Sequence, residues 1–173
     1  YDICHEHLSY YSLNSFEKLL RNFDLKCFYA ETNAVNGGSI RIFVCKKENK
    51  KYDSKKFFNS INKIRKIEKR FKLDKEKTFI NFEKDIDRLK NKTNNYVNKI
   101  LKKGGSVLGL GASTKGNILL QHFGLNKEKI PYISERNLEK VGLSCLGSDI
   151  KLISEELARN MNPDAFLVLP WNF

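Results

Sequence analysis

The feature that most constrains the fold of this chain is a short apolar run that leads into a glycine-rich turn and then into a helix. The apolar run covers residues 106–110, and the turn reads Gly109-Leu110-Gly111-Ala112-Ser113-Thr114-Lys115-Gly116-Asn117. Residues 130–134 and 165–170 are further apolar runs that predict strands, and Ser154 is placed to cap a helix between them. Residues 106–173 therefore predict a βαβαβ unit, half of a doubly wound parallel sheet with right-handed crossovers.

The first 45 residues predict a strand, a helix and a β-hairpin. Ser12 is placed to cap a helix with one apolar stripe, and residues 26–32 and 39–44 predict two strands. The turn between them is Asn36-Gly37-Gly38, because glycine accepts positive φ without penalty. These elements are too few to fold alone. Since the first residue is Tyr1, we expect the chain to be a piece of a longer protein.

Residues 53–101 have a helical pattern with a break near Asp74, and Gly104-Gly105 ends it. The apolar and aromatic residues step by three or four, so we expect them on a buried face. The pattern fits either a helical hairpin that joins two lobes or an amphipathic connector packed on both neighbours, and we favour the connector.

The positive charge of the chain is concentrated in these helices. The net charge is +12, and residues 46–103 hold 21 Lys or Arg against 8 Asp or Glu. Most of these cations are lysines, whereas base readout favours arginine and single-strand binding needs interleaved aromatic side chains. Solvated lysine-rich helices are favoured, and we expect no nucleic-acid partner. A basic RNA-binding domain remains an alternative, which predicts steeply salt-dependent affinity for RNA.

Neither a membrane span nor a secretory leader is visible in the sequence, so we expect no membrane partner and a cytoplasmic location. The four cysteines, Cys4, Cys27, Cys45 and Cys145, include no CxxC pair, which argues against a zinc knuckle. Scattered cysteines at this density suit a reducing compartment.

The glycine turn is the first candidate site. A turn between a strand and a helix favours an anion, because its backbone N–H groups and the helix dipole point at it. Ser113, Thr114 and Lys115 add donors and a positive charge, and Glu135 ends the next strand, where a ribose-binding acid would lie. The spacing GxGxxxxG matches neither common nucleotide-binding pattern. The turn could bind a phosphate or nucleotide, or its glycines could serve only close packing between strand and helix, and the sequence leaves both interpretations open.

The second candidate site is His5-Glu6-His7. His5 and His7 could supply two ligands to a metal ion, but the sequence offers no obvious third ligand, so we assign no metal site. A histidine oriented by a carboxylate suits removal of a proton next to a carbonyl. A pair of structural histidines with satisfied hydrogen bonds is the third reading.

Five segments together resemble a known family. They are Cys4-His5-Glu6-His7-Leu8-Ser9-Tyr10-Tyr11, Asn36-Gly37-Gly38-Ser39-Ile40-Arg41, the turn at 109–117, Ser134-Glu135-Arg136-Asn137 and Leu169-Pro170-Trp171-Asn172-Phe173. In this order they resemble the SAM-dependent sugar C-methyltransferases of deoxysugar biosynthesis. Cys4 stands where the family usually has tyrosine, and Asn36 where it usually has histidine.

The resemblance implies an enzyme of three parts: an N-terminal zinc-binding segment, a central SAM-binding domain and a Rossmann-like C-terminal domain. Residues 1–46 would end the central domain, 47–104 would be a lysine-rich helical connector, and 105–173 the C-terminal domain. The fold expected is therefore α/β, with the Rossmann-like βαβαβ lobe joined by helices to the last strand, helix and hairpin of a truncated methyltransferase domain.

The resemblance also implies the chemistry. His7 would remove a proton next to the 4-keto group of a nucleotide-linked sugar or similar ketone, with Glu6 and His5 beside it, and the resulting enolate would take the methyl group of SAM. The candidates for substrate binding are Gly111, Ser113, Thr114, Lys115, Asn117 and Glu135.

We expect the SAM loop and the zinc ligands upstream of this chain, so that the chain alone is inactive. The alternative is a non-catalytic nucleotide-binding module. The sequence does not fix the acceptor, the methylated carbon or the oligomeric state.

Overall fold

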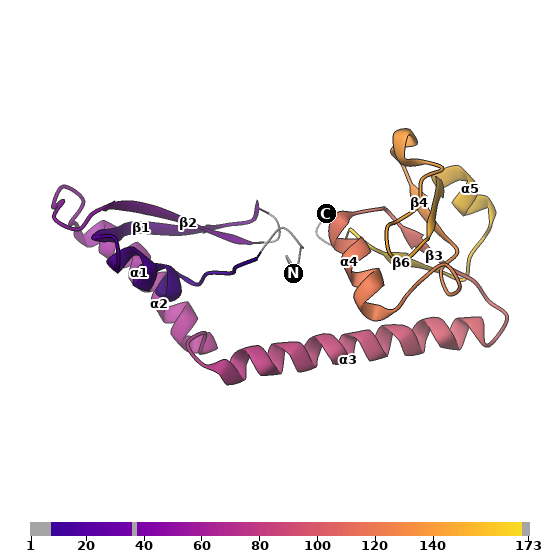
Figure 1. Ribbon diagram of the computed structural model, residues 1–173, viewed down its shortest axis with the longest axis horizontal. Coiled ribbons are helices and arrows are strands. Elements are labelled where there is room, and N and C mark those ends of the chain that lie inside the picture. Colours follow the sequence, from indigo (N-terminus) through magenta and orange to yellow (C-terminus); the bar gives the residue numbers. More distant parts are fainter. Residues whose placement is uncertain (1–7, 36–37, 171–173) are drawn as a thin grey trace. The chain divides into compact units, whose positions relative to one another are not determined.

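The computed structural model describes residues 8–35 and 38–170. These residues divide into two compact units, Leu8–Lys84 and one that begins at Asp85, with the boundary inside a long helix. The elements along the chain are α1 (Leu13–Arg21), β1 (Leu25–Asn33), β2 (Ser39–Lys46), α2 (Lys55–Phe71), α3 (Glu76–Leu101), β3 (Val107–Leu110), α4 (Thr114–Phe123), β4 (Tyr132–Glu135), the 3₁₀ turn η2 (Leu138–Lys140), β5 (Lys151–Ser154), α5 (Glu155–Asn160) and β6 (Ala165–Val168). Figure 1 labels most of them.

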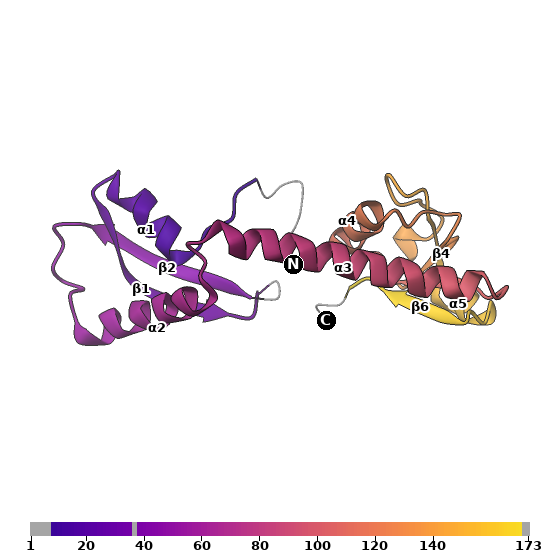
Figure 2. The ribbon, with the colours of Figure 1, turned by 90° about the horizontal axis from the view of Figure 1, so that it is seen from below.

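The first unit is a two-stranded antiparallel hairpin, β1 and β2, with α1 and α2 packed on it. Figures 1 and 2 show the two helices beside each other on the hairpin. Ser12 caps α1 through a reciprocal pair of hydrogen bonds with Ser15, as the sequence predicts. The core of this unit consists of Leu13, Ala30, Ile61 and Ile64.

The helical segment forms two helices with the predicted break, since α2 ends at Phe71 and α3 begins at Glu76. Lys72 closes α2 in the left-handed region with φ of 53°, and Gly104 follows α3 with φ of 77°. Several aromatic side chains that were expected on a buried face are exposed instead. Their exposed fractions are Phe58 57%, Phe71 59% and Phe79 56%.

The second unit is a four-stranded parallel sheet in the order β5-β4-β3-β6. The three predicted strands are present, and β5 is a fourth that the sequence prediction missed. Because strands alternate their side chains between faces, Val107 and Ile133 pack with Leu120 of α4 and Val97 of α3, whereas Leu108 packs with Ala158 of α5. The sheet therefore has helices on both faces, and the prediction of a parallel α/β sheet is confirmed.

This strand order creates a switch point. From β3 the chain moves to one side, through β4 to β5, and then α5 carries it back to β6 on the other side of β3. In open parallel sheets, ligands bind outside the carboxyl ends of the strands where the order reverses. The glycine turn follows β3 directly and so lies at this position.

Candidate functional site

The predicted catalytic residues His5, Glu6 and His7 lie outside the described residues, so their roles stay predictions. Within the part of the chain that the structure describes, no group of three or more His, Cys, Asp or Glu side chains is placed to hold a metal ion. None of its helices combines the length and apolar character that a membrane crossing requires. Among the described residues, the candidate site is the carboxyl edge of the four-stranded sheet.

Gly111 opens the turn after β3 with a backbone that glycine suits, because its φ is 76°. Its N–H donates to the Ser134 carbonyl of β4 at 2.8 Å. A Cβ atom at this position would lie 2.8 Å from Cγ of Pro170, so the turn is tightly packed against the Pro170 ring. The role of Gly111 in this structure is close packing at the switch point.

Glu135 holds the turn from the side of β4. One carboxylate oxygen accepts a hydrogen bond from the Ala112 N–H at 2.9 Å, and the other accepts one from the Asn137 N–H at 2.9 Å. The side chain is largely buried, with 9% exposure. The Ala112 N–H of the turn is therefore already bonded within the protein and is not available to an anion.

Ser113 begins α4. Its Oγ accepts a hydrogen bond from the Gly116 N–H at 3.0 Å, which caps the helix. Gly116 is buried, and a Cβ there would lie 2.6 Å from Cβ of Leu169. The helix therefore starts in close contact with the end of β6, which fixes the direction in which its N-terminus points.

The remaining predicted residues lie on the first turn of α4. Thr114 is exposed and Lys115 is half-buried, and this turn carries no acidic residue. The Asn117 N–H donates to the Ser113 carbonyl at 2.9 Å. The Asn117 Oδ1 is closed off from solvent and has no hydrogen-bond partner. Thr114 is thus the only predicted substrate-binding residue that is exposed.

Two charged residues lie at the same edge but were not among the site residues predicted from the sequence. Arg136 follows β4 and Glu155 follows β5, and the Arg136 Nε donates to Glu155 at 2.6 Å. Arg159 of α5 donates to the same carboxylate. Hydrogen bonds from Arg136 and then from Arg159 lower the pKa of Glu155 to about 2.

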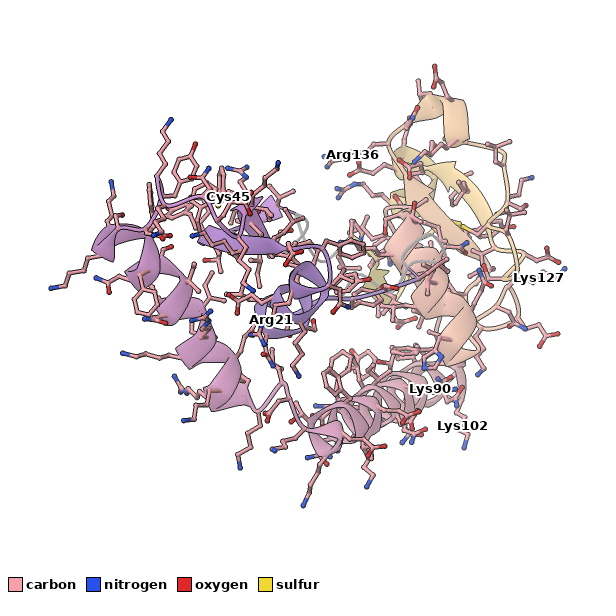
Figure 3. The ribbon with its side chains drawn as sticks, turned by 60° about the vertical axis from the view of Figure 1, so that its left-hand side comes forward. Arg21, Cys45, Lys90, Lys102, Lys127 and Arg136 are labelled. Carbon is pink, nitrogen blue, oxygen red and sulfur yellow. The ribbon has the colours of Figure 1, made fainter. Side chains whose placement is uncertain are left out.

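The Arg136 side chain is 85% exposed and projects from the sheet edge, as Figure 3 shows. Its position directly after Glu135 in the quoted Ser-Glu-Arg-Asn segment was the signal available in the sequence.

The comparisons with known proteins agree with the sequence resemblance. A family model described as "C-methyltransferase C-terminal domain" matches residues 34–173. The chain is 30% identical over 171 residues to C-methyltransferase NovU of Streptomyces niveus, an alignment that covers 99% of this chain and 40% of that relative. The chain thus spans less than half the length of this curated relative. The family that the five segments indicated is confirmed, and the chain belongs to the family of the C-methyltransferase C-terminal domain.

Proposed function

We propose that this chain is part of a SAM-dependent C-methyltransferase that acts on a nucleotide-linked keto sugar or a similar ketone. The observation that carries the proposal is the match of nearly the whole chain to a protein named as a C-methyltransferase. SAM supplies the methyl group when it is bound. The residues that bind it are expected upstream of this chain, as is the zinc site.

In this proposal, His7 removes the proton from the carbon next to the carbonyl group, and Glu6 and His5 orient its ring. A histidine suits this step because its ordinary pKa lies near neutral pH, so that its neutral form is available as a base. Proton removal gives a carbon nucleophile next to the carbonyl group, which is the centre that accepts the methyl group.

The carboxyl edge of the sheet is proposed to bind the nucleotide part of the substrate. The first turn of α4 supports this role, because helix N-termini favour phosphate and the turn carries Thr114 and Lys115 without an acidic residue. Gly111 and Ser113 set its direction, and Asn117 supports it from within α4. Glu135 blocks the Ala112 N–H, so the phosphates are proposed to meet the helix N-terminus and not the turn backbone.

The hairpin is proposed to be the end of the methyltransferase domain, with 47–104 as the connector. Among the described strands, β2 pairs only with β1, so its other edge carries unpaired backbone groups. Ile40, Phe43 and Val44 of β2 are each more than a third exposed. Both features support the pairing of β2 with a further strand of the complete protein.

The test uses the intact enzyme with His7→Ala. We expect methyl transfer to the keto sugar to be lost while SAM still binds, as measured by product formation and by calorimetry. Unchanged turnover would remove His7 from the mechanism. If the intact wild-type protein binds nucleotides but transfers no methyl group to any ketone, the chain is a nucleotide-binding module instead.

A further inference from the structure

A β-bulge in the first unit places an extra aromatic residue, Phe28, in β1. Cys27 pairs with Val44 and Tyr29 pairs with Phe43, so Phe28 is an extra residue without a partner across the hairpin. Bulges of this kind re-aim a side chain. The Phe28 ring stacks on Tyr52, with centroids 4.2 Å apart and planes 14° apart.

A cavity of about 360 Å³ opens beside this stack, at the N-terminal end of α2. Phe28, Tyr52 and Phe58 line it, and Cys27 and Ile61 belong to the same lining. Ile61 is buried at 4% exposure, whereas Phe58 is 57% exposed. A volume in this range, with mostly apolar and aromatic walls and a few polar groups, is typical of a small-molecule site.

The charged side chains that line the cavity are Lys26, Asp53 and Lys55, which give the lining one net positive charge. The Lys26 Nζ pairs with the Asp53 carboxylate at 2.6 Å, which neutralises both. Lys55 also lines the cavity, and no ion pair joins it to any carboxylate of the described residues. A ligand with one negative charge therefore complements the lining.

We propose that this cavity binds a small planar aromatic anion, with its ring against Phe58 and the Phe28–Tyr52 stack and its anionic group toward Lys55. Three aromatic side chains around one space favour a flat ring over a flexible acyl chain, because rings gain from offset or edge contacts. The unpaired Lys55 favours an anion over a neutral ring. This site lies in the first unit and is independent of the proposed nucleotide site on α4.

The test uses 2-naphthoate as the probe, titrated against the full chain by calorimetry. Phe58→Ala is expected to weaken 2-naphthoate about tenfold, and Lys55→Gln about fivefold. The neutral probe 2-naphthol should lose affinity with Phe58→Ala but not with Lys55→Gln. Both side chains are exposed, so these variants should keep the fold, and a thermal melt checks this.

Two control variants lie on α2 outside the cavity. Phe71→Ala removes an equally exposed ring, and Lys63→Gln removes an exposed lysine that forms no ion pair with the described residues. Neither should change the affinity for 2-naphthoate. The proposal is overturned if 2-naphthoate does not bind, if the control variants weaken it as much as the cavity variants, or if octanoate binds as tightly as 2-naphthoate.

Discussion

Glu135 and Ala112 are joined across two neighbouring strand ends: the buried carboxylate of Glu135 accepts the Ala112 backbone N–H at 2.9 Å. The same carboxylate accepts the N–H of Asn137. A side chain on the end of β4 therefore sets the path of the turn after β3. This is the turn from which α4 begins, and with it the proposed phosphate site.

Replacing Glu135 with alanine should destabilise the second unit. The change leaves two backbone N–H groups without their charged acceptor, and hydrogen bonds to charged groups contribute about 1.5–3 kcal/mol each. We expect a loss of about 3–6 kcal/mol for Glu135→Ala and about half of that for Glu135→Gln, which keeps one acceptor oxygen. Urea denaturation of the second unit measures this loss.

The control for this prediction is Glu139→Ala, since Glu139 is exposed and only its backbone N–H forms a hydrogen bond. Hydrogen exchange at the Ala112 amide should accelerate in Glu135→Ala and stay unchanged in the control. A stability of Glu135→Ala within about 0.5 kcal/mol of the wild type would contradict the supporting role of this carboxylate.

The ion cluster of Glu155 predicts a pH dependence at the edge of the sheet. Its hydrogen bonds from Arg136 and Arg159 lower the folded pKa from the ordinary 4.5 to about 2. A carboxyl group with a lowered folded pKa stabilises the fold above its unfolded pKa, and this contribution is lost as the pH falls from 4.5 toward 2.

Nuclear magnetic resonance titration of the Glu155 carboxyl group tests this. Arg136→Gln should raise its pKa toward 4.5, because it removes the largest cause of the shift. Replacement of the exposed Lys151 at the start of β5 should leave it unchanged. An unaltered Glu155 pKa in Arg136→Gln would show that Arg159 alone holds the carboxylate.

Cys27 should be a slow nucleophile at neutral pH. Burial, followed by the nearby Glu17 carboxylate, raises the pKa of its thiol to about 11. Because only the thiolate reacts, alkylation of Cys27 by iodoacetamide should still rise about tenfold per pH unit between pH 8 and pH 10. Peptide mass spectrometry follows each cysteine separately. A rate that levels off near pH 9 would indicate an ordinary thiol.

The elements with strong local signals were predictable from the sequence. Ser12 and Ser154 cap helices as the sequence predicts, and the strand before the glycine turn is present. β5 was missed because Leu152 and Ile153 form only a two-residue apolar run, and the pairing of β5 with β4 that makes it a strand is not a local property.

The position of the glycine turn was predictable from the sequence, but the contacts that its residues form were not. Glycine spacing placed a turn at the end of β3, yet no sequence pattern shows that Glu135 turns back to accept the Ala112 N–H. The spacing of Phe58 and Phe71 on α2 suggested buried rings. Their exposure follows from the small size of the hairpin, which covers only a narrow stripe of the helix that includes Ile61 and Ile64.

The first turn of α1, which Ser12 caps, is also held by a residue far along the chain. The Leu13 and Asn14 N–H groups at the start of α1 both donate to the carboxylate of Glu68, which lies on α2 and is buried. Glu68 comes 55 residues after Leu13 in the sequence. During synthesis on the ribosome, α1 therefore emerges long before the residue that holds its first turn. Its final anchoring has to wait until α2 has left the exit tunnel.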